Sequence, residues 1–307
     1  MRRLAATFAL LACTTASARA QGSEPSRVRL TWENDLFAGR DGHYTNGAVV
    51  ALSGRLGPAL LPAPFHADQG EWEVTLGQQI YTPKDTSTRR LVRDDRPYAG
   101  YAYLGLSAVR RDRRRHLQDR ITLTLGVVGP ASGAEEAHDW AHDLTGSSPA
   151  EGWTHQLRNE PAIGLRYALS TRLARASALG LDADLAANLD LALGNVATNA
   201  SLGATLRVGL NVPDEYSGNA PAQARLYLTA GARLRAVAYD IFLDGNLLRS
   251  GGHRVRKLPL VADVEVALTL AVSDRVSFTY VHTYRTPQFD GQRRGDQFGS
   301  FSLVVSW

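Results

Sequence analysis

Cysteine is almost absent from this chain of 307 residues, and its single cysteine, Cys13, lies near the N-terminus. One cysteine cannot form an intramolecular disulfide or a metal site built from several thiolates. Because Cys13 falls within a segment that we expect to be removed on export, the mature protein is expected to contain none. Stabilisation by disulfides is therefore excluded.

The sequence also lacks an apolar run long enough to cross a bilayer as a helix, which needs roughly 20 residues. The apolar segment at residues 4–12 is too short, follows a basic start and precedes Ala18-Arg19-Ala20, an A-x-A cleavage site. The pattern predicts a secretory signal peptide over residues 1–20 and one domain over residues 21–307. The segment around Cys13 also resembles a lipoprotein processing site, but the A-x-A match is cleaner.

Little net charge remains on the mature chain. The full sequence carries a formal net charge of +4, and removal of Arg2, Arg3 and Arg19 with the signal peptide lowers it to +1. A nearly neutral protein has no general attraction for polyanions, although the isoelectric point of the full chain is basic. We therefore expect no nucleic-acid partner.

What the sequence does contain is an alternation of apolar and polar residues that recurs from Val28 to Trp307. Between residues 179 and 193, leucine and alanine occupy the odd positions and aspartate recurs at the even ones. Residues 258–272 repeat the alternation with apolar side chains at even positions. Strands of soluble sheets usually span about five or six residues, whereas a tilted membrane strand needs about 9–11.

These long alternating segments predict an all-β fold, a transmembrane antiparallel up-and-down β-barrel. The apolar face of each strand would contact lipid, while aspartates and arginines such as Arg233 and Arg235 would line the lumen. Because every backbone group must be paired within a bilayer, such a sheet has to close on itself. We count roughly twelve strands, an even number, as in single-chain bacterial barrels.

The C-terminal segment supports a location in the bacterial outer membrane. Phe301, Leu303, Val305 and Trp307 alternate with polar or small residues up to the last position. Outer-membrane barrels commonly end in such a strand, which their assembly machinery recognises; the alternative is an ordinary edge strand that ends on tryptophan. We expect an integral outer-membrane protein that contacts the assembly machinery through this strand, and a monomer, because a closed barrel needs no partner.

The connections between strands predict where a functional site lies. If the mature N-terminus starts in the periplasm, the outward connections fall near residues 38–43, 82–96, 129–154, 194–198, 244–257 and 286–296. The third is the longest and contains a short helical pattern over Ala134–Leu144, in an extracellular loop. We expect Ser132 to cap this helix, with Glu135 three residues on, and Gly146 to end it.

Polar, turn-rich motifs concentrate on or beside the first three outward connections. They read E-N-D-L-F, H-Y-T-N-G, Q-I-Y-T-P, D-D-R-P-Y-A-G and G-P-A-S-G. Within them, Asn34 has the parity of Trp32 and should face lipid, whereas Asp35 should take the opposite side unless the strand bulges there. An amide on the lipid side suits a substrate that is itself a lipid approaching from the leaflet.

Two histidines, His138 and His142, lie four residues apart and should share one face of the predicted helix. The spacing H-x-x-x-H could bind a metal, but it lacks the glutamate of the zincin motif. Either histidine could instead be a general base, since an ordinary imidazole pKa near 6.5 suits neutral pH. The third interpretation is that both are solvated loop residues.

In these motifs the sequence resembles the outer-membrane lipid A 3′-O-deacylase family. The ordered series, completed by A-H-D-L-T-G and Q-L-x-N-E-P, spans about residues 32–161, and the rest matches only as a barrel. The resemblance implies a twelve-stranded barrel and calcium-dependent hydrolysis of an acyl ester, the 3′-O-linked acyloxyacyl chain of lipid A. Lipid A, or lipopolysaccharide, in the outer leaflet is then the expected partner.

Position by position, the resemblance gives His142 the role of the general base that activates a water molecule. Asn34 and Asp35 match residues that bind Ca²⁺ and stabilise the oxyanion, and Thr45 matches a further position of the site. Arg93 occupies a cationic position that is lysine in the best-known form. Arginine keeps the charge but is not a compact donor, so the departure leaves open whether the substrate is the same.

The leading hypothesis is therefore a lipid A ester deacylase that uses activated water. A serine nucleophile is less favoured, because no serine in the motifs is clearly paired with His142 and Ser132 is assigned to the helix cap. Two alternatives remain. A phospholipase would need the base and the cation but not Arg93, and a non-enzymatic porin or structural barrel would be indifferent to changes at Asn34 or His142.

Overall fold

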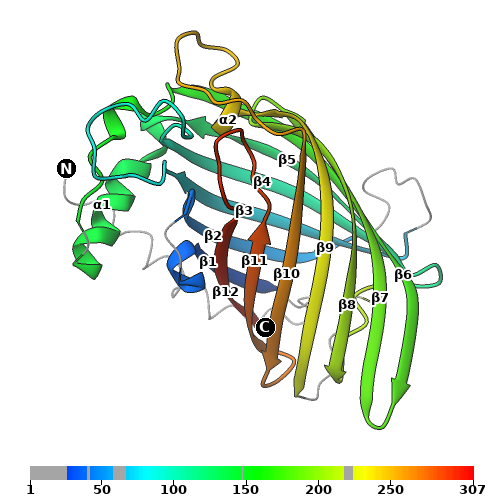
Figure 1. Ribbon diagram of the computed structural model, residues 1–307. Coiled ribbons are helices and arrows are strands. Elements are labelled where there is room, and N and C mark those ends of the chain that lie inside the picture. The colour runs from blue at the N-terminus through cyan, green and yellow to red at the C-terminus, as the bar shows by residue number, and fades with distance from the viewer. Residues whose placement is uncertain (1–25, 40–41, 58–66, 147, 218–223) are drawn as a thin grey trace.

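Among the described residues, twelve antiparallel strands pair in chain order and close into one barrel, with β1 paired to β12 (Figure 1). The computed structural model describes residues 26–39, 42–57, 67–146, 148–217 and 224–307. The predicted signal peptide, including Cys13, lies outside them. The strands are β1 Arg27–Asn34, β2 Tyr44–Leu56, β3 Gln69–Tyr81, β4 Ala99–Asp112, β5 Leu117–Val128, β6 Glu160–Ala178, β7 Leu181–Gly194, β8 Ala197–Leu210, β9 Arg225–Asp240, β10 Leu260–Ala271, β11 Val276–Arg285 and β12 Asp296–Ser306.

The alternation in the sequence sets the two faces of this wall, because successive side chains of a strand point to opposite sides. On β9, Leu228 and Leu234 are 56% and 54% exposed on the outside, as the prediction requires. The next residue, Arg235, points to the opposite side and pairs with the buried carboxylate of Asp263 inside the barrel. Arg285 donates to the same carboxylate at 2.7 Å, so the buried charge is compensated.

Short helices and the long connections gather at one end of the barrel, here called the loop end (Figure 1). Its connections are residues 35–43, 82–98, 129–159, 195–196, 241–259 and 286–295, within a few residues of the predicted outward ones. Its helices are η1 Asp35–Ala38, η3 Pro130–Ser132, α1 Ala134–Thr145, η4 Trp153–His155 and α2 Ile241–Asp244. The part of the chain that the structure describes has no helix with the length and hydropathy needed to span a membrane.

Helix α1 confirms the predicted helix in the third long connection, with one correction. Gly146 ends it in the left-handed conformation, with its amide bonded to the carbonyl of His142, as expected. The expected cap is wrong. Gly133 is the N-cap residue and provides no side chain, whereas the Ser132 hydroxyl donates to the Gly129 carbonyl at 2.6 Å within the preceding 3-10 turn.

Aromatic side chains fill the barrel interior at the loop end. The ring of Phe242 on α2 stacks on Tyr81 with 4.0 Å between centroids, and Tyr101 stacks on Tyr103 at 4.9 Å. Tyr44 is buried beside Tyr81 and donates its hydroxyl hydrogen to Glu33. These inward contacts tie the ends of the first strands together, so residues on their outward faces stand on a rigid support.

Candidate functional site

An outward-facing row of residues crosses six strands at the loop end. Strand pairing joins its members in the order His282, Gly299, Asn34, Asn46, Ile80 and Gly100, here called the outer row. The row faces outward because Trp32, two residues before Asn34 on β1, is 53% exposed. Since neighbouring strands lie about 4.8 Å apart, Asn34 is roughly 10 Å from Ile80 and 14 Å from Gly100 along the row.

Helix α1 is seated on this row, on the outside of the barrel wall. A Cβ atom at Gly100 would lie 2.2 Å from the Cβ of Ala134, the first residue of the helix. The Gln78 side-chain amide, two residues before Ile80, donates to the Ser132 carbonyl at 2.8 Å. Ala134 and Ile80 also share a buried apolar cluster with Trp153. The helix therefore covers the outward faces of β3 and β4.

The two histidines of α1 lie together, as predicted, but in different environments. Their ring centroids are 4.2 Å apart. His142 is half-buried, and its Nδ1 lies 2.5 Å from the Ser148 carbonyl, which can only accept a hydrogen bond. Nδ1 therefore carries the hydrogen, and the lone pair of the neutral ring is on Nε2. His142 is thus presented with one ring nitrogen oriented by the loop.

His138 is 2% exposed, packs edge-on against Trp153, and its Nδ1 finds no hydrogen-bond partner among the described residues. Burial, reinforced by the neighbouring His142, lowers the pKa of His138 to about 4. The ring is therefore neutral near pH 7 and fills space between α1 and η4. His138 thus shares a helix face with His142, as predicted, but it is not a solvated loop residue.

Asn34 and Asp35 lie where β1 changes into η1. The strand ends at Asn34 without a bulge, and the Asn34 Oδ1 atom accepts the amide of Leu36 at 2.8 Å as the cap of the 3-10 turn. Asp35 is 3% exposed, and its Oδ2 accepts the amide of Gly42 at 2.8 Å. The two side chains thus organise both ends of the connection between β1 and β2.

The turn η1 folds over the outer row. A Cβ atom at Gly299 would lie 2.6 Å from the Cβ of Phe37, so only glycine leaves room for the turn. The Tyr280 hydroxyl donates to the Phe37 carbonyl at 3.0 Å. Gly299 lies between Asn34 and His282 in the row, and His282 is a residue that the sequence patterns did not single out.

Asn34 and Asp35 offer only oxygen atoms as metal ligands, which is the chemistry that Ca²⁺ requires. No group of three or more His, Cys, Asp or Glu side chains that could hold a metal occurs among the described residues. The pair fits Ca²⁺ if main-chain carbonyls and water complete a set of about 6–8 ligands. A softer metal held by several imidazoles or thiolates does not fit.

Thr45 leaves the strand ladder beside the row. The register between β2 and β3 shifts between Tyr44 and Asn46, and the Thr45 hydroxyl forms a 2.8 Å hydrogen bond with the Thr82 hydroxyl. Thr82 is 1% exposed. Thr45 therefore joins the start of β2 to the end of β3, next to the row positions Asn46 and Ile80.

Comparison with known proteins assigns the chain to a family. The family model described as outer membrane protein LpxR matches residues 4–307. The chain belongs to the LpxR family. Among solved structures it is similar to LpxR from Salmonella typhimurium, with a TM-score of 0.76 and 19% identity over 91% of this chain and 99% of that chain. The family and the barrel identify this protein as an outer-membrane protein.

More distant barrels match only weakly. The β domain of the Bordetella autotransporter Brka gives a TM-score of 0.43 and 10% identity over 93% of this chain and 98% of that chain. Comparison with curated protein sequences finds no match. At these identities, likeness to solved structures extends to the fold alone.

In this LpxR-family barrel, Arg93 lies on the connection between β3 and β4 and is not a member of the outer row. Its side chain is exposed in the connection between β3 and β4 and forms no hydrogen bond or ion pair with a described residue. Lys84 is another of the five cationic residues on that connection, three residues beyond β3, and its main-chain amide donates to Asp95 at 2.9 Å. Sequence reasoning passed over Lys84, although it directly follows the Q-I-Y-T-P motif.

A buried charge cluster lies beneath these loops, and the sequence analysis did not foresee it. The ring of His43 bonds Asp296 through Nδ1 at 2.7 Å and Asp95 through Nε2 at 3.1 Å. Burial alone would lower the pKa of His43, but the two carboxylates outweigh it and raise that pKa. The buried Arg96 guanidinium donates to the His43 carbonyl at 3.2 Å. Residues from H-Y-T-N-G and D-D-R-P-Y-A-G thus fasten two connections to each other and to the start of β12.

Proposed function

We propose that this protein is a lipid A deacylase that hydrolyses the 3′-O-linked acyloxyacyl ester of lipid A in the outer leaflet. The observation that carries the proposal is the outward position of both His142, on α1, and Asn34, in the outer row. An enzyme for soluble substrates would place such groups in the lumen or on loop tips. Groups on the outside wall of an outer-membrane barrel meet the molecules of the leaflet.

The reaction needs a base for water and a donor for the developing oxyanion. His142 Nε2 takes a proton from water, the water oxygen attacks the ester carbonyl carbon, and the imidazolium then protonates the leaving sugar oxygen. Asn34 Oδ1 is fixed by the Leu36 amide, which orients the Asn34 Nδ2 donor toward the oxyanion. Asp35 and Asn34 would hold Ca²⁺, which supplies positive charge at that oxyanion when bound.

The cations of the connection between β3 and β4 would bind the phosphates of lipid A. Lys84 and Arg93 both lie on this connection, and Lys84 is nearer in sequence to the end of β3. A phospholipid with a single phosphate would depend less on this pair. The activities of Lys84→Gln and Arg93→Gln, compared with each other, therefore show which of these two cations binds phosphate. A loss of activity in these variants that is larger for lipid A than for phospholipid favours lipid A as the substrate.

The test is mass spectrometry of lipid A after incubation with the refolded protein in calcium, in EDTA, and with the variant His142→Ala. We expect loss of one acyloxyacyl mass that requires both calcium and His142. His116→Ala, at the opposite end of the barrel, is the control and should remain active. Intact lipid A with a folded wild-type barrel would overturn the proposal. Phospholipids incubated with the same variants would then test the phospholipase alternative.

A further inference from the structure

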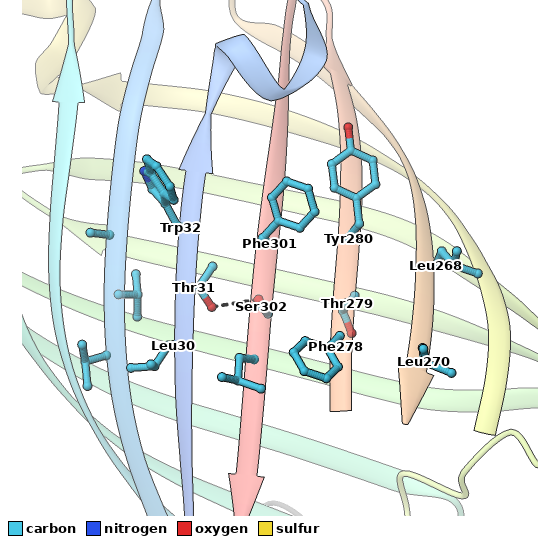
Figure 2. A pocket seen from close by; sticks show the side chains of 14 residues that line it. Leu30, Thr31, Trp32, Leu268, Leu270, Phe278, Thr279, Tyr280, Phe301 and Ser302 are labelled. Atoms are coloured by element: carbon cyan, nitrogen blue, oxygen red, sulfur yellow. Dashed lines mark hydrogen bonds between the residues drawn. The ribbon is translucent and has the colours of Figure 1, made fainter. Parts of the chain in front are cut away.

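The outward surface is hollowed into an apolar pocket of about 480 Å³ at the seam where β1 meets β12 (Figure 2). The pocket lies next to the outer row, on the side away from the loops. Five strands contribute to it, β1, β2, β10, β11 and β12. Its lining includes Leu30, Trp32, Phe278, Tyr280, Phe301 and Leu303.

The lining forms two levels that continue the outer row downward. In the first level, Trp32, Phe301 and Tyr280 are paired side by side across three strands, as Figure 2 shows. Each lies two residues from a member of the outer row, a distance of about 6.8 Å along the strand. Leu30 lies two residues further down, at the second level. The pocket thus begins directly beneath Asn34.

The turn η1 lies over the first level. Phe37 packs edge-on against both Trp32 and Phe301, with 5.0 Å between ring centroids in each case. The same turn carries Asp35 and is capped by Asn34. A molecule in the pocket therefore contacts Trp32 and Phe301, the two rings on which the turn with the proposed oxyanion and cation groups is packed.

An apolar hollow in this wall is occupied by hydrocarbon, because an outer-membrane barrel presents its outward face to the hydrocarbon of the bilayer. We propose that the pocket holds one hydrocarbon chain of the lipid substrate and so sets the ester of that lipid at the level of Asn34. This inference rests on the proposed function. Because all lipid tails in the leaflet are as apolar as the lining, the hydrophobic effect does not favour one tail over another. The substrate chain is selected by close packing against the rings and by its attachment to the ester above.

The variant Leu30→Trp tests the proposal by filling the second level and leaving the first level open. Substrates are lipid A and an analogue with a shortened ester-linked chain, both in mixed micelles. We expect kcat/KM for lipid A to fall about tenfold or more, mainly through KM, because a hydrophobic pocket discriminates by that amount for a misfit of one methylene. The short-chain analogue should react as with wild type.

Leu228→Trp, on the outward face of β9 and outside the pocket, is the matched control and should change neither substrate. Heat-modifiable mobility in gels confirms that each variant is folded. An equal effect of Leu30→Trp on both substrates, or no effect in a folded barrel, overturns the proposal.

A readout without hydrolysis separates this inference from the proposed function. The fluorescence of the His142→Ala variant is measured in vesicles that contain chain-brominated lipid A. The contribution of Trp32 is the difference between this variant and the same variant with Trp32→Phe. We expect quenching above that predicted from the mole fraction of lipid A. Such quenching without hydrolysis by wild type would refute the proposed deacylase activity but support the pocket as a chain-binding site. Hydrolysis by wild type, together with quenching that only follows the mole fraction of lipid A, would support the deacylase and refute the pocket as a chain-binding site.

Discussion

Replacing Gly100 with alanine should strongly reduce the proposed deacylase activity while leaving the barrel closed. Gly100 is the outer-row position beneath the start of α1, and an added Cβ would lie 2.1 Å from the Ser132 hydroxyl oxygen and 2.2 Å from the Cβ of Ala134. The serine hydroxyl can rotate away. The Ala134 Cβ cannot, since it is fixed to the helix backbone.

The geometry gives the size of the effect. Carbon atoms pack at about 3.5–4.0 Å, so the start of α1 must retreat by more than about 1 Å from the wall. A displacement of roughly 1 Å at a reacting group can reduce the rate about 10²-fold. We therefore expect kcat for lipid A to fall about a hundredfold in Gly100→Ala, because His142 moves with the helix.

The assay is the initial rate of deacylation, measured on protein whose folding is verified by heat-modifiable mobility. Gly105→Ala is the control on the same strand, because its new Cβ would meet Thr75 at 3.4 Å, an ordinary contact. Wild-type kcat in a folded Gly100→Ala barrel would refute the idea that the seat of α1 on β4 positions the base. An equal loss in Gly105→Ala would refute it as well.

Three further outcomes are expected. His138→Phe should keep kcat within a few-fold of wild type, because the pKa of about 4 leaves His138 uncharged at neutral pH, whereas a role as ligand or base predicts loss. Asp35→Asn should raise the calcium concentration for half-maximal activity by at least about tenfold in a calcium titration, and an unchanged midpoint would remove Asp35 from the cation site. The His43 cluster should loosen as pH rises through the raised pKa of His43, because its contribution is complete below about 6.5 and is lost above the folded value. The hydrogen-exchange protection of residues 82–98, relative to the intrinsic exchange rate at each pH, should fall over that range, and a fall only at acid pH would contradict the assignment.

The barrel could be predicted from sequence because one physical rule, alternation across a closed wall, repeats in every strand. Parity alone assigned Asn34 to the outside, and its in-register pairing with Gly299 and Asn46 agrees with this, whereas Asp35 lies in η1, where strand parity no longer applies. The helix over Ala134–Thr145 was also predictable, since Gly146 terminates it through its left-handed conformation.

The contacts between distant segments could not be predicted in the same way. Nothing in the local pattern indicates that Gly100 supports Ala134 or that His43 bonds Asp296, since those neighbours are set by how the loops fold back on the wall and by closure of the barrel, respectively. The Ser132 cap failed for a related reason. The serine lies in a 3-10 turn that satisfies its hydroxyl with the Gly129 carbonyl, and only the tertiary seat of η3 selects that turn.

The ladder between β1 and β12 joins the two ends of the chain, as the hydrogen bond between Thr31 and Ser302 illustrates. It carries Asn34, the seat of η1 on Gly299, and the apolar pocket. Pairing of such distant segments has the highest entropic cost of any ladder in the molecule. Until that ladder closes, η1 lacks its seat on Gly299 and the pocket lacks the wall that β10, β11 and β12 contribute. An intermediate in which this ladder is open would therefore lack the proposed chain-binding pocket, and the proposed deacylation would become efficient only on completion of the barrel.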